Sequence, residues 1–326
     1  MTAVAPPSTG LPTSEELSSA WEIGRRHGNR MKFYAPALKR FETPEWAPAK
    51  APHFAAISLT GADCALQCNH CKAKVLETMY PARRPQELWD LAVRLTALGT
   101  RGALITGGSA RNGVVPFIPH FEVMKRIKQE LGWRIVVHSG VADDRLIAGF
   151  ADVGVDGALV DVPPSVAAIR EVLNLKLDPQ DYLTMIDKLV EAGVRVTPHV
   201  VLGMHQGRID GEAEMLDRLA GSGIAALILV VLMPLRDTPL QVVQPPTPEA
   251  LAPLFVRARH RFADIPVVLG CARPGGRHKQ LTDRMAVLAG FNGIAYPADG
   301  MIGVATDAGL TPELHEVCCS LYDVEG

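Results

Sequence analysis

Three cysteines in one short run carry the clearest chemical signal of this chain. Cys64, Cys68 and Cys71 are spaced as Cys-x3-Cys-x2-Cys. A [4Fe–4S] cube takes one protein ligand per iron, so three thiolates from one loop can hold three irons and leave the fourth open. An open iron on an electron-rich cluster can bind S-adenosylmethionine and cleave it reductively to a 5′-deoxyadenosyl radical, which the protein must position and shield. The spacing therefore predicts a catalytic iron–sulfur cluster.

Two other kinds of site could use the same cysteines, a zinc site and a disulfide framework. Cys68-x2-Cys71 alone is a common zinc half-site, but it needs a second ligand pair at a matching spacing. The remaining cysteines are Cys271 and the neighbours Cys318 and Cys319, and vicinal cysteines are poor partners in a tetrahedral site. A disulfide framework is typical of small secreted chains, whereas this one has 326 residues and a start unlike a secretory signal. Both alternatives are weaker than the cluster.

The cysteine run resembles the signature of the radical S-adenosylmethionine superfamily. The resemblance implies that Cys64, Cys68 and Cys71 are the catalytic metal ligands, and that the open iron of their [4Fe–4S] cluster chelates S-adenosylmethionine. The family usually has an aromatic residue just before the third cysteine, and His70 occupies that position here. A planar imidazole could fill the same place beside the cluster and the adenine.

The composition is that of a soluble protein with a sizeable core. The chain is 48% hydrophobic with a formal net charge of −2, a balance that does not favour nucleic acid or an anionic membrane as a partner. No apolar run reaches the length of a membrane span, and residues 1–10 lack the basic start and apolar stretch of a signal peptide. We expect a cytoplasmic protein, in a compartment where thiols stay reduced.

Beyond residue 50 the chain alternates between short β-branched runs and amphipathic helical patterns. The runs predict eight strands, over 54–60, 102–107, 134–139, 156–162, 195–203, 225–233, 266–271 and 292–296. The helical patterns between them fall near 86–98, 119–131, 143–151, 179–192, 211–221, 248–262 and 279–289. Strands that are apolar on both faces and alternate with helices are typical of an α/β fold, the (β/α)8 TIM-type barrel, and a doubly wound open sheet is the alternative.

The two ends of the chain are predicted to extend beyond the barrel. Residues 1–50 form an N-terminal extension, with a disordered start over 1–12 and one helix over about 15–27. The barrel covers 51–300, and residues 301–326 form a C-terminal extension.

Polar or glycine-rich residues follow the predicted strands at their carboxyl ends, where a parallel barrel collects its chemistry. In the superfamily a Gly-Gly-Glu run holds the methionyl amino group, and in dinucleotide sites an acidic residue binds ribose hydroxyls. The candidates for binding S-adenosylmethionine at these strand ends are Thr106, Gly107, Gly108, Ser109, His138, Asp161, Gly203 and Met233.

Several of these candidates have a second interpretation. Ser109 stands where the family has Glu, which weakens the role of its side chain but not that of the glycine pair before it. The glycine pair could also form only a tight turn, and Asp161 could cap the Pro-Pro-Ser segment that follows it. Gly203 resembles the family's fifth-strand glycine that packs beneath adenine, and Met233 could contribute an apolar wall facing it.

The eight predicted units resemble the biotin synthase branch of the superfamily, which includes the hydrogenase-cofactor maturase and methylornithine synthase. Biotin synthase itself matches poorly, because its second cluster needs cysteines on mid-barrel strands and residues 102–203 contain none. Cys271, Cys318 and Cys319 remain for an auxiliary [4Fe–4S] cluster with a weaker fourth ligand. In lipoyl synthases a C-terminal serine is that ligand, and Ser320 directly follows Cys319. The vicinal pair could also be no more than two buried small residues.

Three runs of the sequence resemble the two-component lipoyl synthases, whereas the Cys-x4-Cys-x5-Cys motif of the usual lipoyl synthases is absent. The runs are Phe33-Tyr-Ala-Pro, Ile57-Ser-Leu-Thr-Gly before the cysteine loop, and Gly270-Cys-Ala-Arg-Pro. The resemblance implies a sulfurtransferase that inserts sulfur into an octanoyl group on a lipoyl-carrier protein or peptide. A companion radical enzyme and a low-potential electron donor would assist it.

Two alternatives to sulfur insertion stay open from the sequence. One is a mutase or lyase of the biotin synthase branch, which needs no second cluster. The other is a non-catalytic iron–sulfur or zinc-binding protein.

Overall fold

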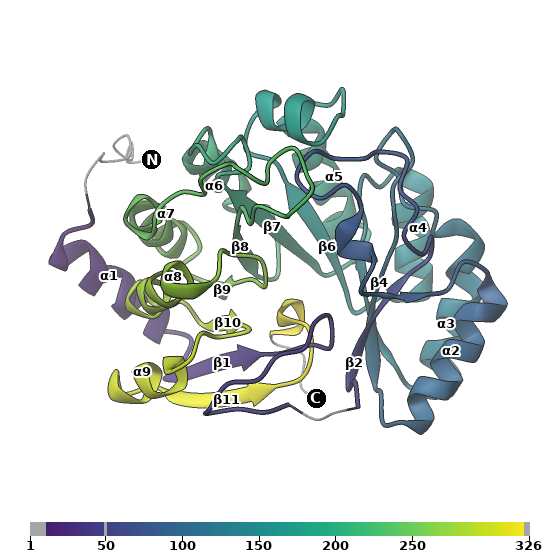
Figure 1. The fold of residues 1–326 in the computed structure, drawn as a ribbon, viewed down its shortest axis with the longest axis horizontal. Helices are drawn as coiled ribbons and strands as arrows, with labels where there is room; N and C mark the ends of the chain where they lie inside the picture. Colours follow the sequence, from purple (N-terminus) through teal and green to yellow (C-terminus); the bar gives the residue numbers. More distant parts are fainter. Residues whose placement is uncertain (1–10, 49–50, 323–326) are drawn as a thin grey trace.

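A single parallel sheet curls around the middle of the molecule in the computed structural model, which describes residues 11–48 and 51–322 (Figure 1). Its strands are β1 (Arg30–Tyr34), β2 (Phe54–Ser58), β3 (Tyr80–Pro81), β4 (Gly102–Thr106), β5 (Arg134–His138), β6 (Gly157–Val162), β7 (Val196–Leu202), β8 (Leu227–Val231), β9 (Val267–Leu269), β10 (Gly293–Ala295) and β11 (Thr311–His315). They lie in the order β11-β1-β10-β9-β8-β7-β6-β5-β4-β2-β3. The eight predicted strands are therefore all present and stand in chain order around the curve.

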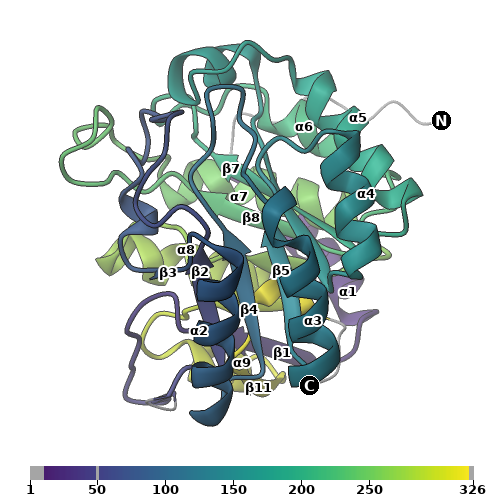
Figure 2. The ribbon, with the colours of Figure 1, turned by 90° about the vertical axis from the view of Figure 1, so that its right-hand side faces the viewer.

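Helices cover the outer face of this sheet, as Figures 1 and 2 show from two sides. They are α1 (Ser14–Arg25), α2 (Pro85–Ala97), α3 (Phe121–Leu131), α4 (Asp144–Val153), α5 (Pro179–Glu191), α6 (Glu212–Leu219), α7 (Pro248–Arg261), α8 (Gly276–Leu288) and α9 (Met301–Asp307). Several begin at an N-cap whose side chain accepts a hydrogen bond from the first turn, as Asp143, Asp178 and Thr247 do. The α/β fold of TIM type predicted from the sequence is confirmed. Within the described residues, no helix has the length and apolar character needed to cross a membrane.

The sheet also contains two strands from the segments that were expected to form extensions. β1 pairs with β10 through Phe33 and Ile294, and with β11 through Phe33 and Leu314. The sheet therefore continues from β10 to β1 and β11, and β10 does not pair with β2. β1 has the sequence Arg-Met-Lys-Phe-Tyr, in which Met31 and Phe33 are fully buried between the less buried Arg30 and Lys32. β11 contains Pro312 and shows only a weak alternation of more and less buried residues. A proline is tolerated there because β11 lies at an edge of the sheet. Of the predicted disordered start over 1–12, residues 1–10 lie outside the described residues.

The C-terminal segment enters the inside of the curled sheet. A short 3-10 turn, η4 (Cys319–Leu321), lies within the curl in Figure 1. Cys318 and Leu321 pack there against Phe54, Val136 and Leu159, which come from β2, β5 and β6. The segment thus fills the interior beneath the carboxyl ends of the strands.

Candidate active site

A cavity of about 370 Å³ lies at the carboxyl ends of the strands. Parallel strands bring these ends to one edge of the sheet, so residues far apart in sequence meet there. Thr106 ends β4, His138 ends β5 and Asp161 lies near the end of β6, and all three line the cavity. Every predicted cofactor- or metal-binding residue except Gly203 lines this one cavity.

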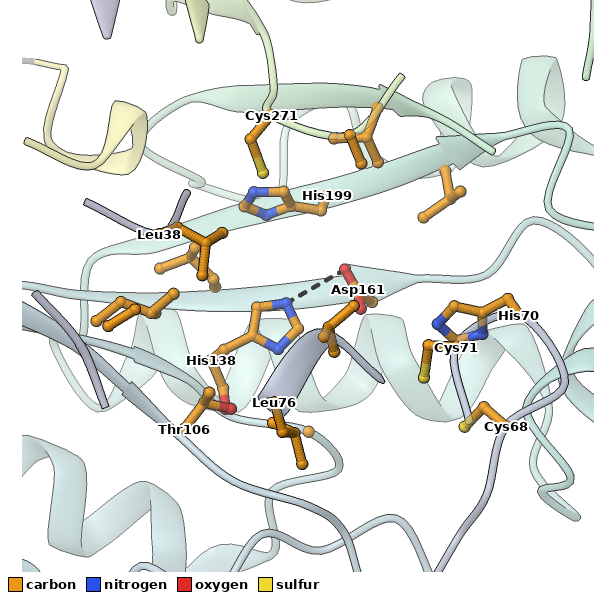
Figure 3. A pocket seen from close by; sticks show the side chains of 18 of the residues that line it. Leu38, Cys68, His70, Cys71, Leu76, Thr106, His138, Asp161, His199 and Cys271 are labelled. Atoms are coloured by element: carbon orange, nitrogen blue, oxygen red, sulfur yellow. Dashed lines mark hydrogen bonds and ion pairs between the residues drawn. The ribbon is translucent and has the colours of Figure 1, made fainter. Parts of the chain in front are cut away.

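The cysteine loop forms one wall of the cavity. Cys64, Cys68 and Cys71 are free thiols, and Figure 3 shows Cys68 and Cys71 beside His70. The Cys68 Sγ lies 3.5 Å from the Leu173 carbonyl oxygen. In the part of the chain that the structure describes, no group of three or more His, Cys, Asp or Glu side chains is arranged to hold a metal ion. The three loop thiols are nevertheless donors of the type that holds iron, and they share one wall of the cavity.

The electrostatics of the loop favour a thiolate at Cys71. A hydrogen bond from the Cys68 thiol, reinforced by His70, outweighs burial and lowers the pKa of Cys71 to about 4. The same bond, together with burial, raises the pKa of Cys68. Burial acts to lower the pKa of His70, but the Cys71 sulfur and the Asp161 charge outweigh it and raise that pKa. The thiolate is the form that binds metals, so Cys71 is prepared as a ligand.

The glycine pair after β4 lets two loops approach closely. A Cβ on Gly108 would lie 1.9 Å from the Asp63 carbonyl oxygen and 2.6 Å from the Cα of Cys64. The Gly108 N–H donates to the Thr60 hydroxyl over 2.7 Å. Gly108 is therefore needed for contact with the cysteine loop itself, which is a different reason from the approach to a ligand that the sequence suggested.

His138 and Asp161 form an ion pair on the cavity wall, with 3.3 Å between Nε2 and Oδ1 (Figure 3). Burial acts to raise the pKa of Asp161, but His138 outweighs it and lowers that pKa. Burial also acts to lower the pKa of His138, but the charge and hydrogen bond of Asp161 raise it. Asp161 faces this histidine and the cavity, and no capping bond to the Pro-Pro-Ser segment is found among the described residues.

The structure separates the last two cofactor candidates. Met233 lines the cavity and its side chain is partly exposed, whereas Gly203 does not line the cavity. Gly203 has a φ of +76°, and a Cβ there would lie 2.4 Å from the Pro246 ring. Its N–H donates to Glu212 Oε1 over 2.8 Å. Gly203 therefore packs against Pro246, and its neighbour Met204 lines the cavity.

A second group of thiols lines another part of the same cavity. Cys271 follows β9, and Cys318 and Cys319 come from the inserted C-terminal segment. A hydrogen bond from the Cys319 thiol, together with the Ser320 hydroxyl 3.1 Å away, outweighs burial and lowers the pKa of Cys318 to about 7. That same contact raises the pKa of Cys319, and burial raises the pKa of Cys271. Ser320 is fully buried and is not among the cavity-lining residues.

His199 is a cavity residue to which the sequence gave no role. Figure 3 shows it between Cys271 and the pair formed by His138 and Asp161. Its Nδ1 lies 3.2 Å from the Thr197 carbonyl oxygen, and burial lowers the pKa of the imidazole to about 4. The signal for it was present, because strand alternation places His199 on the same face as Val201, which also lines the cavity.

Comparisons with known proteins agree with this arrangement. A family model described as the Radical SAM superfamily matches residues 58–226. The fold is similar to that of methylornithine synthase PylB, with a TM-score of 0.63 and 14% identity over 93% of this chain and 91% of that one. It is also similar to HydG, a maturase of the [FeFe]-hydrogenase (TM-score 0.61, 14% identity, 96% of this chain and 70% of that one).

A further similar structure is Streptococcus suis SuiB bound to S-adenosylmethionine (TM-score 0.51, 12% identity, 71% of this chain and 52% of that one). The search of curated proteins finds no match. At these identities the structural likeness concerns the fold alone.

Proposed function

Since the chain belongs to the radical SAM superfamily, as the match over more than half of its length shows, we propose that this radical enzyme inserts sulfur into an unactivated C–H bond. The substrate is an octanoyl group on a lipoyl-carrier protein or peptide, and the chain acts as one component of a two-component lipoyl synthase. Its companion is a related radical enzyme, and a low-potential donor supplies electrons. The protein works in the cytoplasm, where its thiols stay reduced.

The residues of the first wall fit the [4Fe–4S] cluster and S-adenosylmethionine that this superfamily uses. Three thiols of one loop line the cavity, and Cys71 is prepared as a thiolate. The cradle beside them depends on Gly108, which has no room for a Cβ, and His70 Nδ1 is buried without a hydrogen-bond partner among the described residues. Cys64, Cys68 and Cys71 would hold the cluster, and the pair of His138 and Asp161 would contact the cofactor.

When bound, this group supplies a carbon-centred radical that can remove a hydrogen atom from a saturated carbon. The chain's own contribution is to orient the substrate and to keep water away from the radical. The apolar wall, to which Leu104, Leu159, Val201 and Val230 contribute, suits a saturated acyl chain.

The observation that carries the sulfur-insertion proposal is the second group of thiols on the same cavity. Sulfur insertion needs a sulfur source within reach of the carbon that loses its hydrogen. Cys271, Cys318 and Cys319 are three thiols that all line the cavity. An auxiliary [4Fe–4S] cluster held by them would face the substrate, with a fourth, weaker ligand completing it.

A mutase or lyase without sulfur insertion is the second candidate. The similarity of fold to methylornithine synthase over nearly the whole of both chains favours it. Such a reaction needs no auxiliary cluster, so the chain would hold about four irons rather than about eight. A non-catalytic cluster carrier would bind iron but form no deoxyadenosine under a strong reductant.

The experiment compares wild-type protein with Cys271→Ala, both reconstituted anaerobically and given an octanoylated peptide, the companion enzyme and a strong reductant. We expect wild type to form 5′-deoxyadenosine and a thiolated or lipoylated peptide. In a parallel assay that omits the companion, which is itself a radical enzyme, Cys271→Ala should still form 5′-deoxyadenosine but no C–S bond. Absence of any sulfur-bearing product from wild type with a fully loaded second cluster would reject sulfur insertion while leaving the radical assignment intact.

A further inference from the structure

A segment after β6 holds the cysteine loop in place. The segment contains a single π-helical turn, η3 (Ala168–Val172), and such turns are frequent at functional sites. The Asn69 N–H donates to the Val172 carbonyl and the Asn69 amide to the Glu171 carbonyl, each over 2.7 Å. In the other direction, the Asn174 amide donates to the Gln67 carbonyl over 2.9 Å. The placement of the thiols therefore depends on where this segment lies.

η3 packs in the core through Ala168, Ile169 and Val172, and its Glu171 side chain is held by one buried histidine and by the Gln206 amide, which donates to Glu171 Oε2 over 3.2 Å. His205 Nε2 lies 3.1 Å from Glu171 Oε2, and His205 Nδ1 lies 2.7 Å from Asp210 Oδ2. The His205 side chain is 7% exposed, whereas Glu171 is about half exposed. Ser165 also donates to Asp210, over 3.2 Å, and Arg208 Nη2 lies 3.0 Å from His205 Nε2. His205 thus connects the loop after β7 to the segment after β6.

The loop that carries His205 also contributes to the cavity. Met204, the preceding residue, is 2% exposed and lines the cavity wall. His205 itself is not among the cavity-lining residues, so it lies behind the wall to which Met204 contributes. One short loop therefore contacts the cavity through Met204 and η3 through His205.

We propose that His205 is a positioning residue. Through its contact with Glu171 it fixes the cysteine loop relative to the part of the cavity wall that Met204 forms. This inference needs the three loop cysteines to hold the catalytic cluster, but it does not depend on sulfur insertion. Without the contact between His205 and Glu171, η3 and the cysteine loop gain freedom relative to the wall on which the cofactor binds.

Two substitutions at this position separate the contacts of the two ring nitrogens. The side-chain amide of His205→Gln can reach Glu171 as Nε2 does, whereas the shorter amide of His205→Asn can reach only Asp210 as Nδ1 does. A matched control is His27→Ala, because His27 Nε2 also joins two segments, through the Ala263 carbonyl 3.0 Å away, but at a distance from the cavity in sequence and in the fold.

The first measurement is hydrogen–deuterium exchange on the metal-free proteins. We expect His205→Asn to raise exchange about tenfold in residues 66–74 and 168–175, since one hydrogen bond to a charged group is worth about that factor. His205→Gln and His27→Ala should match wild type in both segments. Equal behaviour of the Asn and Gln variants would overturn the proposed role of the Glu171 contact.

The second measurement is the electron paramagnetic resonance spectrum of the reduced cluster before and after S-adenosylmethionine is added. The spectral change on adding the cofactor should be weakened in His205→Asn, with a raised KM for S-adenosylmethionine, and retained in His205→Gln. An unchanged spectrum and KM in His205→Asn would reject the inference and leave the radical assignment standing. Failure of wild type to bind any cluster through the loop cysteines would reject both.

Discussion

The two groups of thiols on the cavity wall are assembled in opposite ways. Cys64, Cys68 and Cys71 come from one run of eight residues, and a hydrogen bond within the run prepares one thiolate. Cys271 and Cys318 line one cavity only because β11 joins the sheet and the chain after it turns into the curl of the sheet. The first group is a local motif that any suitable loop can present, whereas the second is a property of the complete fold.

The largest expected difference between the two groups is in radical formation. Replacing all three loop cysteines by alanine should abolish 5′-deoxyadenosine formation, because no ligand would be left to hold the catalytic cluster. The matched replacement of Cys271, Cys318 and Cys319 by alanine should retain it. Chromatographic measurement of 5′-deoxyadenosine under a strong reductant checks both, and activity of the loop variant would contradict the assignment.

Gly108→Ala tests whether the loop needs its close support. The added Cβ would meet the Asp63 carbonyl and the backbone of Cys64, so the loop must shift and cluster uptake should fall severalfold. Gly132→Ala is a control for the protein as a whole, since a Cβ there meets open space, although its φ of +66° carries some strain of its own. Iron uptake per chain is the measurement, and wild-type uptake by Gly108→Ala would show that the loop tolerates displacement.

Leu321→Ala tests the dependence of the second group on packing inside the barrel. Leu321 is 3% exposed and packs against Phe54, Val136 and Leu159. Its truncation should cost about 2–5 kcal/mol of unfolding free energy through lost burial and a cavity. Denaturant titration of the metal-free protein measures this cost. A loss below about 0.5 kcal/mol, the size of an ordinary surface substitution, would mean that the segment is not held as described.

A smaller, pH-dependent effect on the free energy of unfolding is expected at the pair of His138 and Asp161, which lines the same cavity as the two groups of thiols. The raised pKa of His138 means that its contribution to stability is present below about pH 6.5 and lost as the pH rises through its folded value. The lowered pKa of Asp161 means that its contribution is present above about pH 4 and lost as the pH falls through its folded value. The pair should therefore stabilise the protein most between these two limits.

Asp161→Asn should consequently lower the unfolding free energy at pH 5 by about 0.5–1 kcal/mol, since solvent screens this partly exposed pair. The difference from wild type should shrink at pH 9. The control is Asp152→Asn, which removes a surface partner of Lys125 and should show no such change between the two pH values. A difference that grows at pH 9 would contradict the assigned charges.

The same contrast between local and distant assembly decides how much could be predicted from the sequence. The eight strands of the barrel, the cysteine loop and the strand-end residues follow from local patterns, and the structure brings thirteen of the predicted site residues to one cavity. β1 was missed because its few apolar residues lie in a polar linker, and β11 because Pro312 and its charged neighbours hide a strand that only an edge position allows.

The details of side-chain placement were the least predictable. Gly203 and Met204 are adjacent, and only the position of Pro246 decides which of them faces the cavity. His199, in the middle of β7, was not predicted because a lone histidine in a strand more often serves as a hydrogen-bond partner than as a functional group. Such choices depend on contacts between loops, which no single run of the sequence contains.

The most direct test of the account is the iron and sulfide content of three anaerobically reconstituted proteins. Wild type should hold about eight irons per chain, and each of the two triple cysteine-to-alanine variants about four, because under the proposed function each thiol group would hold one [4Fe–4S] cluster. Only the variant that keeps Cys64, Cys68 and Cys71 should form 5′-deoxyadenosine. A wild type with about four irons, all of them lost when the loop cysteines are replaced, would contradict the second cluster and with it sulfur insertion.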